Sequence, residues 1–198
     1  MRAANAAARF ALGGLAGKTA AMHRLFVAIR PPEGIRDTLI DAMDDSPDLR
    51  WVGDDQLHCT LRFIGEVDGP LADDIALALG QIRFPRFELT VAGAGIFDRR
   101  GGGALWAAVR PKEPIAALAA KVERACAAAG LEPERRAFHP HITLARWNRR
   151  SAAAAQAFLQ RNRALATPAF AVERFILYES RLSRHGAHYE AMAEFPLV

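Results

Sequence analysis

The sequence has little of several features that would assign a protein class by themselves. It contains only two cysteines, Cys59 and Cys126, and no Cys-x-x-Cys pair, so neither a disulfide framework nor a cysteine metal site is supported. No apolar run approaches the roughly 20 residues that a membrane-spanning helix needs. Low-complexity linkers and heptad repeats are also lacking, so we expect a globular protein without a membrane partner.

Lysine is rare as well, and arginine supplies most of the positive charge. The chain has 26 basic and 22 acidic residues, a net charge of +4 and a sequence pI of about 9.6. This mild basic excess permits an anionic partner such as RNA but does not require one. With 198 residues, of which 51% are hydrophobic, the chain can bury a core of normal size.

The first 21 residues differ in character from the rest. They carry no acidic residue, and their apolar segment FALGGLAG is short and contains three glycines. We expect residues 1–21 to be a disordered extension or the result of a start placed too early, with Met22 as the natural start. A secretion signal is the alternative. Residues 22–198 are then expected to form one domain.

Strands and helices are predicted to alternate irregularly along the remaining chain. Period-two and β-prone runs predict strands, whereas spacing of three and four between apolar residues predicts helices. The expected strands are 23–29, 57–67, two within 86–111 around the loop DRRGGG, 140–147, 170–180, and a last one after a turn at His185-Gly186. The expected helices are 32–45, 69–83, 114–130 and 151–163. Short links between several strand pairs favour an α+β fold with largely antiparallel sheets.

Two short stretches carry the same polar pair. LHCTLRFIG and PHITLARWN both read His-x-Thr-Leu. Residues two apart in a strand share a face, so His58 points with Thr60, and His141 points with Thr143. If these strands lie side by side, two imidazoles and two hydroxyls converge on one site.

Such a site is suited to paired acid–base chemistry on a phosphate. One neutral imidazole can take a proton from a nucleophile while a protonated one donates to the leaving group. The threonine hydroxyls can stabilise charge on phosphoryl oxygens. No metal is required, since His139 and His141 have no adjacent Asp or Glu to complete a ligand set. Cys59 could be read as a nucleophile, but strand alternation turns it into the core as a small hydrophobe.

The chain also resembles a known family. LHCTLRFIGEV and FHPHITLAR resemble the paired His-x-Thr motifs of the two-histidine (2H) phosphoesterase superfamily. More narrowly, the stretches HRLFVAIRPP, RWVGDDQLHCTLRFIGEV and LYESRLSRHGAHYEAMAEFPL are similar to the bacterial and archaeal RNA 2′,3′-cyclic phosphodiesterases, also called 2′-5′ RNA ligases. The resemblance covers about residues 22–197.

The resemblance implies a fold and a reaction. The fold would be a single bilobal domain, in which two similar α+β lobes with mainly antiparallel sheets and outer helices flank a central groove. The reaction would open a terminal 2′,3′-cyclic phosphate of RNA and leave a 2′-phosphate, with 2′-5′ ligation as its reverse. His58 would be the proton donor, His141 the proton acceptor, and Thr60 and Thr143 would hold the phosphate oxygens. No cofactor would be involved.

The expected partner is therefore RNA with a 2′,3′-cyclic phosphate end, with tRNA fragments as candidates. We expect a cytoplasmic monomer. Two alternatives stay open at this point. A related phosphoesterase could act on a small cyclic-phosphate nucleotide, or the chain could be a non-catalytic RNA-binding module. The presence of both histidines and both threonines disfavours the second alternative.

Further residues are weaker candidates for substrate contacts. Arg62 is four residues after His58, so regular alternation would place it on the site face, where it could contact phosphate or lie exposed. Arg146 matches the family's arginine after the second motif, although its parity places it opposite His141. Phe138 and Trp51 could stack on a base, with core packing as the alternative.

The remaining candidates have simpler interpretations. His139 and His185 are expected to be loop residues, and we can argue no role for His188 or Tyr189. Three Arg-Arg pairs could form a basic rim for RNA or lie in solvated loops; these are 99–100, 135–136 and 149–150.

Overall fold

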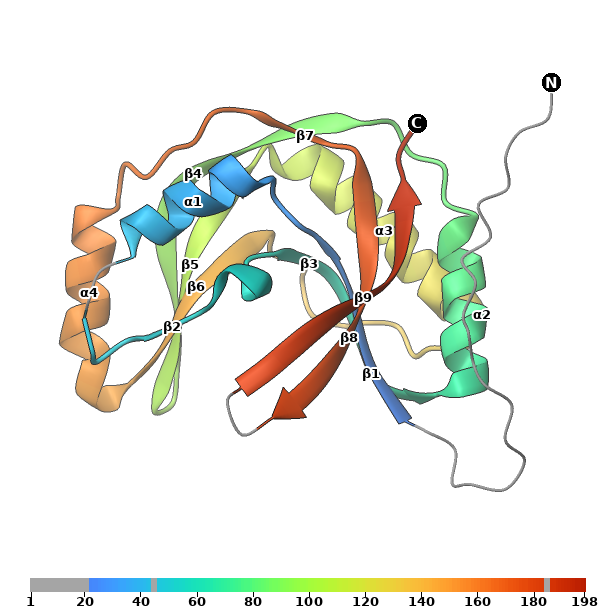
Figure 1. Cartoon of the computed structure of the whole chain (residues 1–198), viewed down its shortest axis with the longest axis horizontal. Helices are drawn as coiled ribbons and strands as arrows, with labels where there is room; N and C mark the ends of the chain where they lie inside the picture. The colour runs from blue at the N-terminus through green and yellow to red at the C-terminus, as the bar shows by residue number, and fades with distance from the viewer. Residues whose placement is uncertain (1–21, 44–45, 184–185) are drawn as a thin grey trace.

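The structure, a computed structural model, describes residues 22–43, 46–183 and 186–198. These residues form one nine-stranded sheet in the order β7-β4-β5-β6-β3-β1-β8-β9, with β2 paired to β6 (Figure 1). Every strand pairing among them is antiparallel, and helices accompany the sheet, which confirms the predicted α+β class. The expectation for residues 1–21 and part of the turn expected at 185–186 lie outside the described residues.

The elements follow the predicted order with shifted ends. The strands are β1 (Met22–Ile29), β2 (Arg50–Trp51), β3 (Cys59–Asp68), β4 (Phe87–Arg99), β5 (Gly102–Arg110), β6 (His141–Asn148), β7 (Phe170–Val172), β8 (Arg174–Ser183) and β9 (Gly186–Pro196). The helices are α1 (Glu33–Ala42), α2 (Gly69–Gly80), α3 (Lys112–Ala128) and α4 (Ala152–Arg161), with short 3-10 helices η1 (Asp54–Gln56) and η2 (Arg149–Ser151).

Two of the strand predictions need correction. The strand expected at 57–67 is shifted to Cys59–Asp68, and Gly65, whose φ of +91° lets the backbone bulge, lies within it. The strand expected at 170–180 is two strands separated at Glu173. They are separate because β7 pairs with β4, whereas β8 pairs with β1 and β9.

The sheet consists of two halves that meet at one point. One half is β7-β4-β5-β6 with β2, and the other is β3-β1-β8-β9. Within the described part of the chain, a single residue pair, Cys59 with Ile142, joins the strands β3 and β6 of the two halves. Helix α4 packs on β4, β5 and β6, whereas α2 and α3 pack on each other and on β3. Figure 1 shows α1 and α4 on the left, and α2 and α3 on the right.

Alternation along each strand separates two faces of the sheet. In β1, Leu25, Val27 and Ile29 belong to the main core beneath the helices. Phe26 and Ala28 turn the other way and form a second, smaller apolar cluster with Ile176 and Tyr178 of β8. We call the face that carries this second cluster the site face.

Local signals account for where the helices begin. Helix α2 starts at Gly69-Pro70, where the Asp68 side chain accepts a hydrogen bond from the Leu71 amide at 3.0 Å. A proline in the first turn and an acidic N-cap both favour a helix start. No helix of the described residues is long and apolar enough to cross a membrane.

Candidate active site

The joint between the two halves brings the two motifs together. His58 immediately precedes β3, and His141 is the first residue of β6. Cys59 and Ile142, which pair at the joint, are 2% and 0% exposed and belong to the main core. Alternation therefore turns the flanking histidines and threonines to the site face, where all four are partly exposed. Those four residues are His58, Thr60, His141 and Thr143.

His141 is held by its own connector and by aromatic rings. Its Nδ1–H donates to the His139 carbonyl at 2.6 Å, which leaves Nε2 as the free ring nitrogen. The Phe97 ring lies edge-on with centroids 4.9 Å apart, and Trp106 lies at 6.2 Å. Burial lowers the pKa of His141; the hydrogen bond to the His139 carbonyl partly opposes this, and the nearby charge of Arg146 adds to the lowering.

His58 has a corresponding environment in the other half. A ring N–H donates to the carbonyl of Gln56, two residues earlier, as in the second motif. The rings of Phe26 and Tyr189 lie 4.9 and 5.3 Å from the imidazole, and Tyr178 lies at 6.4 Å. Burial lowers the pKa of His58 to about 4, and the charge of His141 contributes to the lowering. This contribution agrees with the pairing of Cys59 and Ile142, which places the two histidines on adjacent strands.

The two imidazoles and two hydroxyls are arranged so that they can bind an anion. In the part of the chain that the structure describes, neither the Thr60 nor the Thr143 hydroxyl has a hydrogen-bond partner, so both can donate to a ligand. An anion bound between the histidines would favour their protonated forms and raise both lowered pKa values. The site can therefore hold one proton to give and one neutral nitrogen to accept a proton.

The 3-10 helix before His58 is hydrogen-bonded to α1, to β9 and to the link between β1 and α1. Asp54 accepts from Arg30 at 2.7 Å and from Arg36 at 2.6 Å, and these hydrogen bonds and charges hold the pKa of the carboxyl below its usual value. The Gln56 side-chain amide donates to the Ala187 carbonyl of β9 at 2.6 Å. These contacts fix the carbonyl of Gln56, which in turn orients the His58 ring.

Arg62 does not lie on the site face, because β3 contains a bulge. Ala28 pairs with Thr60 and Val27 pairs with Arg62, so Leu61 is an extra residue that reverses the alternation. Arg62 is 9% exposed, and its Nε lies 2.7 Å from Glu123 of α3. The prediction of a site-face position is therefore wrong.

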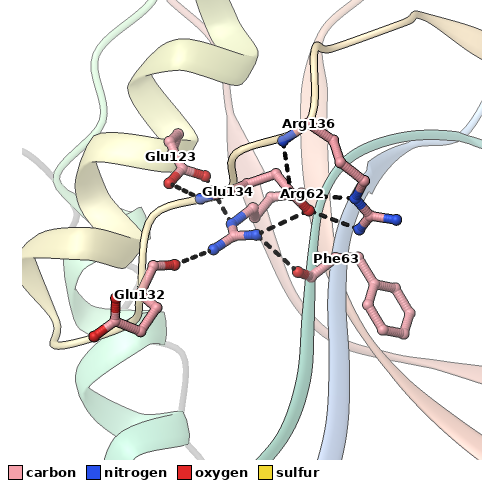
Figure 2. A network of polar contacts seen from close by, with 6 residues as sticks. All are labelled: Arg62, Phe63, Glu123, Glu132, Glu134 and Arg136. Carbon is pink, nitrogen blue, oxygen red and sulfur yellow. Dashed lines mark hydrogen bonds and ion pairs between the residues drawn. The ribbon is translucent and has the colours of Figure 1, made fainter.

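Figure 2 shows the Arg62 network on the helix side of the sheet. The guanidinium also donates to the carbonyls of Glu132 at 2.6 Å and of Phe63 at 3.2 Å. The Glu134 carboxylate, 3.5 Å from Arg62, is shared with Arg136. The network thus fastens the connector between α3 and β6 to strand β3.

Arg146 lies on the site face, also because its strand contains a bulge. Trp106 pairs with Thr143 and Leu105 pairs with Ala145, so Leu144 is an extra residue in β6. The bulge rotates Arg146 to the face that carries Thr143, and the side chain is exposed there. The predicted position opposite His141 is therefore wrong. The effect of its charge on the pKa of His141 agrees with the site-face position.

The remaining candidates lie in different surroundings. Cys59 is buried, and burial raises the pKa of its thiol to about 12, so it is a core residue and not a nucleophile. Trp51 packs edge-on against Phe158 of α4 with centroids 5.2 Å apart, which matches the core-packing alternative. Phe138 is 36% exposed in the connector before β6. His185 lies outside the described residues.

The Arg-Arg pairs do not form one rim. Arg99, Arg100 and Arg149 line a hollow of about 850 Å³ beside Trp147, at the end of the β4–β5 hairpin. Arg136 is instead paired with Glu134 at 2.7 Å. The first and third pairs therefore share a surface, and the second belongs to the Arg62 network.

Sequence reasoning missed the residues that surround the histidines. Tyr178 and Tyr189 lie far from both motifs in the sequence, and His139 shapes the second motif through its backbone carbonyl. Phe26 could have been found, because alternation in β1 places it opposite the core residues Leu25 and Val27. The other three depend on pairings and turns that carry no local sequence signal.

Comparison with known proteins agrees with this geometry. The chain matches the 2′-5′ RNA ligase superfamily over residues 31–184 and belongs to that superfamily. An RNA 2′,3′-cyclic phosphodiesterase of Aeropyrum pernix is 34% identical over 157 residues, which cover 74% of this chain and 85% of that protein. The Escherichia coli protein of the same name is 33% identical over 186 residues, covering 89% and 97% of the two chains.

The fold is shared with solved structures of this superfamily. The crystal structure of E. coli LigT complexed with 3′-AMP has a TM-score of 0.73 at 31% identity, covering 90% of this chain and 99% of that one. A Thermus thermophilus protein has a TM-score of 0.69 at 28% identity, covering 87% and 97%. These similarities confirm the predicted fold of the 2H phosphoesterases.

Proposed function

We propose that this protein hydrolyses the terminal 2′,3′-cyclic phosphate of RNA and leaves a 2′-phosphate. The observation that carries the proposal is the pairing of Cys59 with Ile142, which sets two His-x-Thr pairs side by side on the site face. The names of the A. pernix and E. coli relatives support the choice of substrate.

The reaction needs one proton accepted and one donated. The neutral Nε2 of His141 takes a proton from water as the water oxygen bonds to phosphorus. The bond from phosphorus to O3′ breaks on the opposite side, and the protonated His58 donates its proton to O3′. Thr60 and Thr143 donate hydrogen bonds to the non-bridging oxygens, where charge builds up. Proton exchange with solvent then restores both histidines.

Among the lower-ranked residues, Arg146 is the best candidate for a substrate contact. It lies exposed on the site face, and its charge reaches both His141 and Tyr189, where it opposes the rise that burial causes in the pKa of the tyrosine. A guanidinium can hold two phosphate oxygens at once. We assign Phe138 only an exposed position in the connector before β6, and Arg62 no substrate contact.

The reverse reaction would join a 5′-hydroxyl to the cyclic phosphate and form a 2′-5′ linkage. In this ligation the 5′-hydroxyl replaces water as the nucleophile, so His141 would take its proton and His58 would again protonate the departing O3′; the roles are exchanged only when the 2′-5′ linkage is cleaved back to the cyclic phosphate.

We propose that residues 22–198 act as one bilobal, monomeric unit in the cytoplasm and that the reaction needs no metal. We also propose that tRNA fragments are among its substrates.

A direct test follows ring opening in an RNA that ends in a 2′,3′-cyclic phosphate. We expect turnover in the presence of EDTA, because the proposed steps use only imidazoles and hydroxyls. Absence of ring opening would overturn the proposed function. Activity that EDTA abolishes and magnesium or zinc restores would contradict the metal-free mechanism.

A further inference from the structure

Strand β2 places a second arginine beside Arg146. In the pairing of β2 with β6, Arg50 lies opposite Arg146, and Trp51 lies opposite Ala145. Trp51 and Ala145 both belong to the main core, on the helix side of the sheet. Alternation therefore puts the Arg50 side chain on the site face next to Arg146, where both are exposed.

The pairing of two like charges is unfavourable without an anion. Residues directly opposite in an antiparallel pair have Cβ atoms about 5 Å apart, and like charges at that separation destabilise the sheet. Many arginines of this chain have carboxylate partners, such as Arg30 and Arg36 with Asp54. Over the described ranges, neither Arg50 nor Arg146 forms an ion pair. Two unpaired guanidinium groups side by side form a site for a phosphate.

The two arginines differ in their distance from the reacting phosphate. Arg146 follows Thr143 on the site face of β6, so its charge lies near the centre of the site, in agreement with its effect on the pKa of His141. Arg50 is on the next strand, about 4.8 Å further from β5 than Arg146 is. A phosphate bound by Arg50 would therefore be a neighbour of the cyclic phosphate along the same strand.

We propose that Arg50, together with Arg146, binds a phosphodiester of the RNA chain upstream of the cyclic phosphate. This inference rests on the proposed function and refines its substrate class. A mononucleotide has no such phosphodiester, so the subsite makes the enzyme prefer a polynucleotide over a small cyclic nucleotide. It thus decides between the two catalytic alternatives that the sequence leaves open.

The test compares two substrates in three proteins. The substrates are a 2′,3′-cyclic mononucleotide and a short oligoribonucleotide that ends in the same cyclic nucleotide. The proteins are the wild type, Arg50→Gln, and Arg124→Gln, which removes an exposed arginine of α3 on the helix side. We expect the wild type to prefer the oligonucleotide in kcat/KM. Arg50→Gln should lower the ratio of the two kcat/KM values about tenfold, and Arg124→Gln should leave the ratio unchanged.

Salt and heat provide readouts that a purely structural role of Arg50 would not reproduce. Loss of one phosphate contact should reduce the slope of log kcat/KM for the oligonucleotide against log salt by about 0.7. The melting temperature of Arg50→Gln should equal or exceed that of the wild type, because a like-charge pair has been relieved.

Three outcomes would overturn the inference. They are an unchanged substrate ratio in Arg50→Gln, an equal fall for both substrates with a lower melting temperature, and a wild type without preference for the oligonucleotide. In each of them the oligonucleotide ring is still opened, so the proposed function survives. A wild type that does not open the oligonucleotide would count against that function.

Discussion

The two motif regions share a backbone plan but differ in the side chains around it. In each, the histidine ring donates to the carbonyl two residues earlier, and the leucine after the threonine is an extra residue in a bulge. The bulge then turns the residue three after the threonine to the site face. That residue is Phe63, 42% exposed, in the first motif and Arg146 in the second.

The histidine environments differ as well. His58 lies among Phe26, Tyr178 and Tyr189, and its pKa falls to about 4 because of burial. His141 lies beside Phe97 and close to the charge of Arg146. We propose that the shared backbone supplies two equivalent imidazoles and that neighbouring side chains assign one to the leaving group and the other to the nucleophile.

The largest expected effect comes from removing either imidazole. His58→Ala and His141→Ala should each lower kcat for cyclic-phosphate hydrolysis by about 10²–10⁴-fold, because each removes one proton-transfer group. Steady-state kinetics on proteins with unchanged circular dichroism would check this. His188→Ala, which removes an exposed histidine 3.8 Å from Asp55, is the control. Full activity in either motif variant would refute the assignment.

Removal of the threonine hydroxyls should have a similar but smaller effect. Thr60→Val and Thr143→Val keep the shape of the side chain and remove one donor to a phosphoryl oxygen. We expect each to lower kcat by about 10²–10³-fold. A difference between them would sharpen the comparison, since it would show which half carries more of the developing charge. If neither variant changes kcat, the hydroxyls do not contact the phosphate.

The two bulges make Arg62 and Arg146 exchange their expected roles. Arg146→Gln should lower kcat/KM about 10–100-fold with little change in stability, because it loses a charged contact with phosphate. Arg62→Gln should instead lower the free energy of unfolding by about 2–3 kcal/mol. This value is lower than the cost of breaking a fully buried ion pair, because Glu123 is 27% exposed and can be solvated once Arg62 is removed. Urea denaturation and steady-state kinetics on both variants test these two predictions. A loss of stability in Arg146→Gln together with a loss of kcat/KM in Arg62→Gln would contradict the strand register described above.

The smallest effect is a displaced pH optimum. In the free enzyme His58 must be protonated and His141 neutral, and burial lowers both pKa values. Above pH 6.5 both rings are neutral, so kcat/KM should fall as pH rises and should peak below pH 6.5. Tyr189→Ala would hydrate His58 and raise its pKa, which should move the peak to higher pH. A wild-type peak above pH 7, or no displacement in the variant, would contradict this account of burial.

Much of this architecture could be predicted from the sequence, and the failures have physical causes. Apolar periodicity located the helices and most strands, and alternation located His58, Thr60, His141 and Thr143 on one face. Alternation fails beyond a bulge, because the extra residues Leu61 and Leu144 leave no local mark in the sequence.

Other features depend on long-range pairing. The break at Glu173 arises because β7 and β8 pair with different strands. Tyr189 reaches His58 only through the pairings of β9 with β8 and of β8 with β1. Propensity and period describe neighbours along the chain, so they could not place this ring in the site.

The most direct test of the different roles of the two halves is the identity of the monoester formed from an RNA 2′,3′-cyclic phosphate. If His58 protonates O3′ and His141 activates water, the product carries a 2′-phosphate. Digestion with a phosphatase specific for 3′-phosphates, or phosphorus NMR of the product, distinguishes the two isomers. A 2′-phosphate is the predicted result. A 3′-phosphate would mean that O2′ leaves, and it would contradict the roles assigned to the two histidines.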